Sequence, residues 1–378
     1  MGMNYLVFLF LFGFLINSLN CSFQSKLFNK MNKGKIGENL IISPLSIFQA
    51  LSLTANGAKE ETLSEMLELL EFNSIDKLNE LNYQILSNFK HFSTVDIANA
   101  VMTRITPLKS FSNIAEKYLA PVEPLISVEQ VNKWCSNKTH GKIDKILDSL
   151  SEETVMIILN AVYFKGEWMF QFEEELTKEL PFYNLGTTKK NVNTMTLFKN
   201  FQYYEDKKVQ AIKLKFNEDF MSAIIILPAE GNDINKYINT LSNSNDEYTK
   251  IIKGLNYAKV HLQLPKFEVN FSDNLKDILT DLGMYNAFSS KYADFTGLQK
   301  EKGLFISSVI HKTYLKVNEQ GTEAAAVTAI SIDALADDDE NEKIFDMKVN
   351  RPFLFLLKND KLPDGYDLLF MSKIEKIE

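Results

Sequence analysis

The chain has 378 residues, of which 45% are hydrophobic and 24% are charged, and its formal net charge at pH 7 is −8. This composition supplies an ample core, and the acidic balance with scattered lysines argues against nucleic-acid binding. No low-complexity linker, internal repeat or break in composition divides the chain, so we expect one large domain rather than two.

The N-terminus has the pattern of a targeting segment. Leu6 to Ile16 form an eleven-residue apolar run, which is too short for a comfortable membrane span, and mostly polar residues follow it up to Ser22. We therefore predict a signal peptide over residues 1–21, secretion to the extracellular space, and no membrane association after cleavage. An uncleaved anchor is the alternative, because no Lys or Arg precedes the apolar run.

Helix-like and strand-like patterns follow in blocks along the rest of the chain. Residues 25–90 and 112–150 are predicted to be rich in helix, and Ser43-Pro44 has the pattern of the start of a helix that runs through Ile47 to Leu53. Strand-like runs are predicted at 155–165, 202–228, 257–272, 304–318 and 351–373.

The chain has two cysteines and two short sequences that match the glycosylation pattern. Cys21 lies at the end of the predicted signal peptide, so Cys135 would be the one thiol of the mature chain, and no intramolecular disulfide could form. We expect Cys135 to be a packed structural residue rather than a nucleophile. Asn137 and Asn270 each begin an Asn-x-Ser/Thr sequence and are candidate glycosylation sites.

Motifs of well-known enzyme chemistry are missing from the sequence. None of the four histidines has the H-E-x-x-H spacing and there is no C-x-x-C, so we predict no metal site. The G-x-S-x-G, G-x-G-x-x-G and phosphate-binding glycine patterns are absent too. We expect no enzymatic activity and no cofactor, although a pair of acidic residues brought together by folding cannot be judged from sequence. Structural roles are expected for His91, His140, His261 and His311.

The stretch from Lys316 to Asp333 is the most informative part of the chain. A turn-prone Gln320-Gly321 precedes a dozen small, β-branched or acidic residues without Pro. Its three consecutive alanines fit a helix, since Ala is the best helix former. Sorted by alternation, however, one side carries only small or β-branched residues, as expected of a strand that can be buried; these are Thr322, Ala324, Ala326, Thr328, Ile330 and Ile332. The acidic run at 337–340 has the pattern of an exposed loop. We therefore predict that 322–333 is attached to an exposed loop but could later enter a sheet as an additional buried strand.

This stretch and several short blocks resemble the serpin family. Residues 317–326 are similar to the hinge that precedes the reactive centre loop of serpins. Further blocks in family order include Asn-Leu-Ile-Ile-Ser-Pro-Leu-Ser-Ile at 39–47 and Leu-Asn-Ala-Val-Tyr-Phe-Lys-Gly-Glu-Trp at 159–168. The others lie at 132–143, 264–267, 293–297 and 351–355. Together they cover nearly all of residues 25–375, so the chain is identified by resemblance as a serpin.

The resemblance implies an α+β fold. It has a large central, mostly antiparallel sheet, additional sheets, about eight or nine helices and an exposed reactive centre loop. The serpin domain would span residues 23–378 and the loop about residues 319–349. The blocks of helix-like and strand-like pattern agree with this class. The loop is unusually long for a connection between two strands, which itself marks it as functional.

Site residues are assigned by the same resemblance. The hinge comprises Glu319, Gly321, Thr322, Glu323, Ala324, Ala325 and Ala326. The shutter, a polar cluster beneath the centre of the main sheet, comprises Ser43, Ser46, Asn160 and His311. The breach, where an inserting strand enters the sheet, comprises Trp168 and Lys266, and Lys266 is expected to pair with Glu319. Each assignment has a purely structural alternative. Ser43 could be a helix cap, His311 a core histidine and Trp168 a core tryptophan, and Lys266 and Glu319 could form an ion pair at the surface.

The function implied is that of a monomeric suicide inhibitor. A serine protease would cleave the loop, form a covalent acyl complex and be trapped as the hinge inserts into the sheet. Family spacing from Gly321 puts the reactive bond at Leu335–Ala336, which favours chymotrypsin-like, cathepsin G-like or elastase-like targets. The alternatives are a papain-like cysteine protease that cuts after Ala336, or a non-inhibitory carrier or chaperone. The helix expected at 78–90 has basic residues only at its ends, so no strong heparin site is predicted.

The sequence departs from the family pattern near its end. Ser372 stands where the closing motif usually has Gly, and the usual terminal Pro is missing. The segment from Leu335 to Pro352 is longer than usual. These departures leave the local geometry and the exact reactive bond open.

Overall fold

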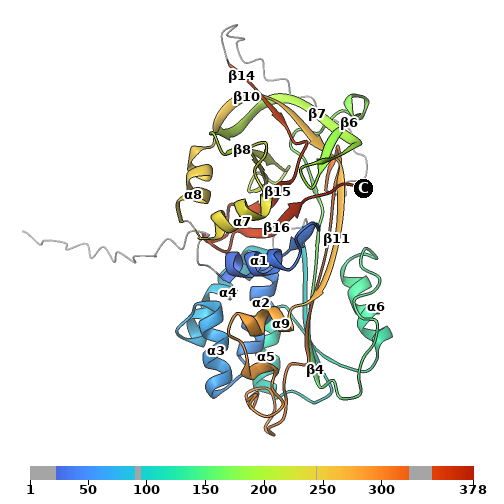
Figure 1. Cartoon of the computed structure of the whole chain (residues 1–378). Coiled ribbons are helices and arrows are strands. Elements are labelled where there is room, and N and C mark those ends of the chain that lie inside the picture. The colour runs from blue at the N-terminus through green and yellow to red at the C-terminus, as the bar shows by residue number, and fades with distance from the viewer. Residues whose placement is uncertain (1–22, 90–94, 244, 323–342) are drawn as a thin grey trace, which may run out of the picture.

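The computed structural model describes residues 23–89, 95–243, 245–322 and 343–378 (Figure 1). The predicted signal peptide, His91, hinge residues 323–326 and the Leu335–Ala336 bond lie outside the described residues. None of the helices in these ranges is both long enough and apolar enough to span a bilayer.

Nine α-helices lie in the described ranges, in agreement with the expected number. They are α1 (Phe23–Lys33), α2 (Pro44–Ala55), α3 (Glu60–Leu70), α4 (Ile75–Phe89), α5 (Lys109–Lys117), α6 (Val128–Lys138), α7 (Ile234–Asn243), α8 (Asn245–Gly254) and α9 (Lys276–Asp281). The predicted helix-rich blocks contain α1 to α6. The sequence patterns did not predict α7 and α8, which lie between the strand-like runs 202–228 and 257–272, or α9, which lies between the runs 257–272 and 304–318.

The strands of the described residues form three sheets. The largest has the order β1 (Leu40–Ile42), β16 (Leu368–Ile374), β15 (Phe353–Asn359), β9 (Met221–Pro228), β8 (Val209–Lys215), β7 (Thr188–Glu205), β10 (Asn256–Pro265) and β14 (Ile344–Lys348), with β6 (Lys178–Asn184) paired to β7. The five-stranded sheet has the order β11 (Phe267–Asn274), β12 (Ser308–Val317), β4 (Met156–Phe164), β2 (Val95–Thr103) and β3 (Val122–Pro124). The third consists of β13 (Gly321–Thr322) and β5 (Gly166–Glu167).

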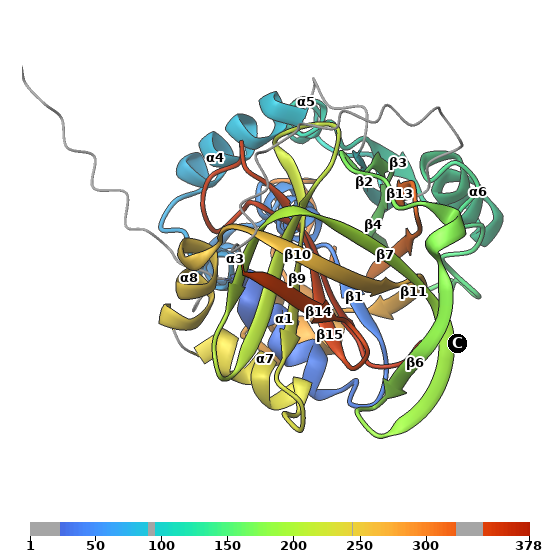
Figure 2. The ribbon, with the colours of Figure 1, turned by 90° about the horizontal axis from the view of Figure 1, so that it is seen from above.

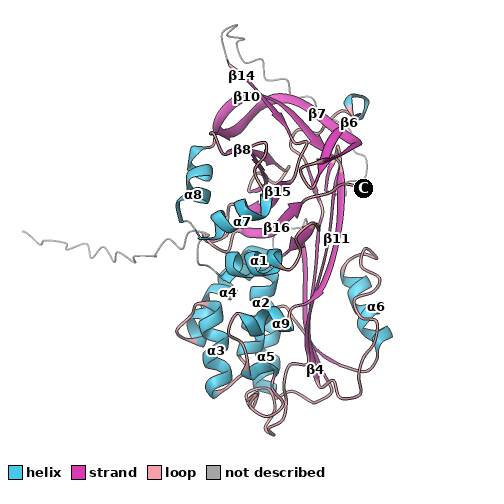
Figure 3. Ribbon diagram, in the orientation of Figure 1, coloured by secondary structure: helices cyan, strands magenta, loops and turns pink. Residues whose placement is uncertain are grey.

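Helices cover both faces of the five-stranded sheet (Figure 3). Strand β4 is buried along its whole length, as expected for a central strand covered on both faces. Alternate residues of β4, such as Ile158 and Val162, belong to the main core with α2, whereas Leu159 and Ala161 join a second cluster with Cys135 of α6. An inserted strand beside β4 would therefore be buried on both of its faces.

The start of α2 confirms the predicted helix N-terminus. Pro44 is the first helical residue, and Ser43 is the N-cap with an extended backbone, but the Ser43 side chain makes no capping hydrogen bond. Every residue of α2 is buried, because the helix lies between the five-stranded sheet and the other helices. It therefore holds Ser46 rigidly beneath the sheet.

The α+β class, with a large sheet, further sheets and nine helices among the described residues, confirms the predicted fold. The five-stranded sheet is more mixed than the expectation of a mostly antiparallel sheet. Its β11–β12 and β4–β2 pairs are antiparallel, whereas β12–β4 and β2–β3 are parallel. The physical reason is that β12 and β4 are direct neighbours, with no strand of opposite direction between them.

Candidate functional site

A row of polar residues crosses the middle of the five-stranded sheet. Asn99 of β2 lies opposite Asn160 of β4, and Asn160 lies opposite His311 of β12. Ser43 and Ser46, at the start of α2, lie against this row from below. The structure thus brings together the four residues assigned to the shutter.

The hydrogen bonds of the row have one consistent direction. The backbone N–H of Ser43 donates to Nε2 of His311 at 3.2 Å, so Nδ1 carries the ring proton and donates to Oδ1 of Asn160. The amide of Asn160 donates to Ser46 and to Asn99, and the Ser46 hydroxyl donates to Oδ1 of Asn99 at 3.3 Å. The network therefore requires the neutral form of His311.

Burial enforces that neutral form. The side chain of His311 is fully buried, and desolvation lowers its pKa to about 3. Protonation of Nε2 would also remove the acceptor that faces the Ser43 N–H. The hydrogen bonds that join α2, β4 and β12 are consequently sensitive to acid.

Two details of the row differ from the sequence assignment. Ser43 contributes its backbone N–H, while its hydroxyl is buried without a partner among the described residues. Asn99 is part of the network although the sequence analysis did not single it out. The available signal was an Asn inside the apolar strand Val95–Thr103, which is the same signal that marks Asn160 in β4.

An ion pair between Lys266 and the enclosed carboxylate of Glu319 lies beside the end of β12, as expected for the breach. Nζ of Lys266 lies 2.9 Å from Oε1 and 2.8 Å from Oε2 of Glu319, and the Thr177 hydroxyl donates to Oε1 at 2.8 Å. The Glu319 side chain is only 4% exposed and that of Lys266 is 37% exposed. Burial opposes ionisation of Glu319, but the hydrogen bonds from Lys266, the backbone and Thr177 outweigh it and lower its pKa. The carboxylate is enclosed, whereas the ammonium group belongs to a partly exposed side chain, so only one partner of the pair is at the surface.

Trp168 joins the hinge to the body of the protein. Its indole N–H donates to the Asn318 carbonyl at 3.0 Å, its backbone N–H donates to the Gln320 carbonyl at 2.9 Å, and its ring stacks on Phe216 with centroids 4.4 Å apart. The indole is thus part of the core, as the alternative of a core tryptophan predicted. It also holds the turn before Gly321 in place.

The described end of the hinge already forms a strand pair. Gly321 pairs with Glu167 and Thr322 with Gly166, antiparallel. Gly321 has φ +145°, and a Cβ atom there would lie 2.0 Å from the carbonyl oxygen of Gly166, so only glycine fits. Thr322 is fully buried, and its hydroxyl accepts from the Gly166 N–H at 2.9 Å.

The other predicted residues lie away from this site. Cys135 is a free, fully buried thiol of α6, and burial raises its pKa to about 12, so it is poorly suited to be a nucleophile. Asn137 on α6 and Asn270 on β11 both have exposed side chains. Their glycosylation stays a prediction. Within the described ranges no three His, Cys, Asp or Glu side chains are grouped so as to hold a metal ion.

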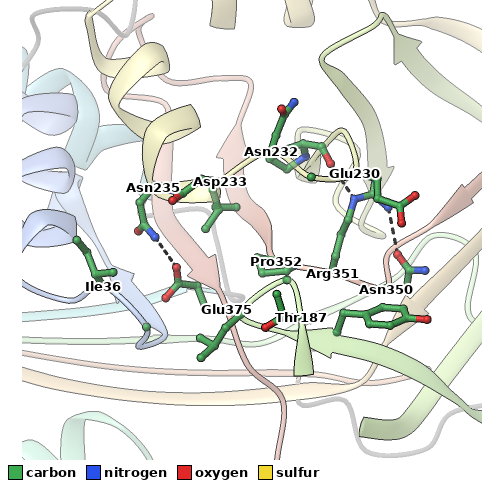
Figure 4. A pocket seen from close by; sticks show the side chains of 17 residues that line it. Ile36, Thr187, Glu230, Asn232, Asp233, Asn235, Asn350, Arg351, Pro352 and Glu375 are labelled. Atoms are coloured by element: carbon green, nitrogen blue, oxygen red, sulfur yellow. Dashed lines mark hydrogen bonds between the residues drawn. The ribbon is translucent and has the colours of Figure 1, made fainter. Parts of the chain in front are cut away.

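A pocket of about 730 Å³ lies between the start of α7, the β6–β7 hairpin and the end of β16 (Figure 4). On its wall, Asn235 donates to Glu375 at 2.6 Å, and the fully buried Lys373 donates to Asn235 at 2.9 Å and to the Lys35 carbonyl at 2.8 Å. These bonds anchor the C-terminal segment. Ser372, which stands in place of the family's usual glycine, is buried within β16 opposite Ile41 and Phe355, and its hydroxyl has no hydrogen-bond partner among the described residues.

Comparisons with known proteins agree with this geometry. A family model described as Serpin (serine protease inhibitor) matches residues 18–377. The leukocyte elastase inhibitor of Xenopus laevis is 32% identical over 91% of this chain and 96% of its own. Intracellular coagulation inhibitor 2 of Tachypleus tridentatus is 33% identical over 90% of this chain and 86% of its own.

Solved structures show the same fold. The native state of the thermophilic serpin tengpin is 30% identical, with a TM-score of 0.85, over 100% of this chain and 96% of its own. Thyroxine-binding globulin in complex with thyroxine is 25% identical, with a TM-score of 0.83, over 95% of this chain and 98% of its own. The chain belongs to the serpin family. The proteins it resembles include an elastase inhibitor, a coagulation inhibitor and a thyroxine-binding globulin.

Proposed function

We propose that this chain inhibits serine proteases as a suicide substrate and has no catalytic activity of its own. A protease would cleave the segment 323–342, and the part attached to Thr322 would then enter the five-stranded sheet. The observation that carries this proposal is the direct, parallel pairing of β4 with β12, from Ser308–Ile157 to Tyr314–Tyr163. A strand that follows β12 through the turn at 318–321 and enters between β12 and β4 would run antiparallel to both of them. The single ladder of hydrogen bonds between β4 and β12 would then be replaced by two ladders.

The register at the hinge supports the same conclusion. Gly321–Glu167 and Thr322–Gly166 start an antiparallel ladder along the chain that leads back into β4. Continued without a shift, this ladder would put Ala324 opposite Phe164 and Thr328 opposite Asn160. The small side chain of Ala324 would then face the bulky ring of Phe164, and the hydroxyl of Thr328 would face Asn160 in the polar row.

The remaining pairs fit in the same way. The ladder would set Ile330 opposite Ile158, and both side chains would face the main core that Ile158 joins. About ten additional hydrogen bonds at ~1 kcal/mol each, together with roughly 1.5–3 kcal/mol for burying Ile330, would favour insertion. Deacylation depends on oxyanion-hole donors and a water molecule that are precisely placed in the active site of the protease. The inserting segment would pull on the attached enzyme and distort this arrangement, so the acyl-enzyme would be trapped.

A protease panel tests the proposal. Incubation with chymotrypsin-like, elastase-like, trypsin-like and papain-like enzymes should give a denaturant-stable covalent complex with a chymotrypsin-like or elastase-like serine protease. Mass spectrometry should place the cut at Leu335–Ala336, and the cleaved chain should melt at a clearly higher temperature than the intact one. Cleavage by every enzyme without trapping would favour a carrier or chaperone instead.

The variant Ala324→Pro sharpens this test. In the continued ladder Ala324 would lie opposite Phe164, and a proline there has no N–H to donate to the new strand pairing. We expect cleavage of the variant to continue and trapping to fail, so more inhibitor is consumed per enzyme inhibited. An unchanged stoichiometry would contradict insertion as the trapping step.

We further propose that the chain is secreted. The support is the apolar run Leu6–Ile16 followed by polar residues, which has the length of a signal peptide rather than of a membrane span. The name of the Tachypleus relative contains the word intracellular, so kinship alone does not decide the compartment. Expression in a secretory cell with N-terminal sequencing of the medium tests it: retention of the full-length chain inside the cell would contradict secretion.

A further inference from the structure

The pocket between the start of α7, the β6–β7 hairpin and the end of β16 has an apolar rim. Seen from above, α7 and the hairpin lie along one edge of the molecule (Figure 2). Ile36 is 70% exposed and Leu185 is 51% exposed, and both line the pocket together with the rigid rings of Pro228 and Pro352. The volume of about 730 Å³ lies in the range of sites that hold small molecules. The exposed apolar side chains would be stabilised by a ligand that covers them.

At one end of the pocket, a buried carboxylate oxygen has no hydrogen bond. The Glu375 side chain is 4% exposed, and Asn235 donates to its Oε1 at 2.6 Å. Its Oε2 accepts no hydrogen bond among the described residues. Nζ of Lys373 lies 3.4 Å from Oε2, but it donates to Asn235 and to the Lys35 carbonyl. Because buried polar groups rarely stay without a partner, Oε2 of Glu375 is suited to accept from one more donor.

At the other end of the pocket, a cation has unused donors. Figure 4 shows Arg351 and Glu230 across the pocket from Glu375. Arg351 donates from Nε to the Pro228 carbonyl at 2.9 Å and from a terminal nitrogen to Oδ1 of Asn350 at 3.1 Å. These bonds use two of its five N–H groups, so three remain available within the described ranges. Burial lowers the pKa of Arg351 and nearby Glu230 opposes this shift, but the guanidinium stays charged.

We propose that this pocket binds a short peptide that has free termini and apolar side chains. The carboxylate of the peptide would lie on Arg351, because a guanidinium binds a carboxylate through two parallel hydrogen bonds. The ammonium group would donate to Oε2 of Glu375, and the apolar side chains would cover Ile36 and Leu185.

Two features favour a peptide over simpler ligands. A fatty acid or a simple amine would satisfy only one end of the pocket, whereas a peptide carries a cation and an anion at opposite ends. Thr187 and Asn232 also line the pocket and can form hydrogen bonds with the amide groups of a peptide. Binding here requires neither cleavage of the segment 323–342 nor its insertion into the sheet, so the inference is independent of the proposed inhibition.

Calorimetry with the purified chain and the tripeptide Leu-Gly-Leu tests the proposal. Each charged end should contribute to binding, so the N-acetylated and the C-amidated forms of the tripeptide should each bind about tenfold more weakly or worse. The free tripeptide should also raise Tm, because it binds the folded chain and not the unfolded one. Equal affinities of the three forms, or no binding at millimolar concentration, would overturn the proposal.

Two variants with opposite expected effects locate the site. Arg351→Lys keeps the charge but loses the paired hydrogen bonds, so the affinity for Leu-Gly-Leu should fall about tenfold. Glu230→Gln removes an exposed carboxylate beside Arg351 and should raise the affinity several-fold, because the carboxylate of the peptide is then repelled less. The matched control is Glu116→Gln, at an exposed position of α5 away from the pocket, which should change nothing.

The exposed position of Glu230 keeps the test decisive even if Arg351→Lys fails to fold. An affinity of Glu230→Gln equal to that of the parent chain would put the peptide elsewhere, for example between β4 and β12, and would overturn the proposal.

Discussion

Asn160 and His311 lie opposite each other in β4 and β12, and the hydrogen bond between their side chains closes the position that an inserted strand would occupy. The same two residues are joined through Ser46, Asn99 and the Ser43 backbone to α2 and β2. Separation of β4 from β12 must therefore break a buried polar network. Such a network favours the closed sheet until another strand supplies equivalent partners.

The first prediction concerns acid. Unfolded His311 binds a proton near pH 6.5, whereas the buried ring does so only near pH 3, so between these values the unfolded state binds more protons. Stability should therefore fall as pH decreases from about 6.5 toward 3, by up to about 1.4 kcal/mol per pH unit from this group. Urea unfolding at about pH 7, 6 and 5 should show a shallower dependence for His311→Gln than for the parent chain. His140→Gln, at an exposed position, is the control, and parallel slopes for parent and His311→Gln would contradict this account.

The second prediction concerns the turn before the hinge. Gly321→Ala should destabilise the native protein by about 2 kcal/mol or more, because the new Cβ meets the Gly166 carbonyl and β13 must leave β5. Gly186→Ala is the matched control, since Gly186 has φ +78° but open space around its Cα, and it should cost only about 1 kcal/mol. Thermal unfolding measures both. Equal losses would show that the hinge tolerates displacement of β13.

The third prediction concerns the ion pair at the breach. Lys266→Ala leaves the enclosed Glu319 carboxylate with Thr177 as its remaining side-chain donor, and this should cost about 1–3 kcal/mol. Glu319→Gln should cost less, because an amide does not leave a buried charge without its counter-ion. Urea unfolding measures the stability of each variant. A smaller loss in Lys266→Ala than in Glu319→Gln would contradict the structural ranking.

The pair also has a defined pH range. Because the pKa of Glu319 is lowered in the folded protein, its contribution is present above the ordinary glutamate pKa and is lost as pH falls through the folded value. The dependence of stability on pH in Glu319→Gln should therefore differ from that of the parent chain only in acid, below about pH 4.5. Differences near neutral pH would contradict the assignment.

The fourth prediction concerns Thr328. If the ladder at Thr322–Gly166 continues unshifted, the Thr328 hydroxyl meets Asn160 after insertion. Thr328→Val should then reduce the rise in melting temperature that follows loop cleavage, because a buried amide loses a partner at a cost of about 1–3 kcal/mol. The intact form should be unaffected. Thr328→Ser, which keeps the hydroxyl, is the control, and an unchanged rise in Thr328→Val would refute this register.

The fifth prediction concerns specificity. Leu335→Arg should redirect inhibition toward trypsin-like enzymes, whose primary pocket carries a buried carboxylate that pairs with a guanidinium, and should weaken inhibition of chymotrypsin-like enzymes. Inhibition rates against both enzyme classes measure the change. A verified cut after residue 335 with no gain against trypsin would show that loop geometry rather than the pocket residue selects the target.

The sequence alone determined the family, the fold class and most of the site. The small residues after Gly321 alternate as a buriable strand must, and Ser43-Pro44 begins a helix. Both are local rules, since side-chain direction and helix initiation depend on near neighbours. The assignment of Asn160 and His311 to one cluster came from family resemblance.

The tertiary structure decided what those residues contact. Asn160 and His311 are 151 residues apart, and only the parallel pairing of β4 with β12 makes them partners and adds Asn99. Enclosure of Glu319 and exposure of Leu185 likewise follow from which strands and loops pack over each position. Periodicity fixes the face on which a side chain lies, whereas burial, pKa and hydrogen-bond partners depend on distant segments that no local pattern specifies.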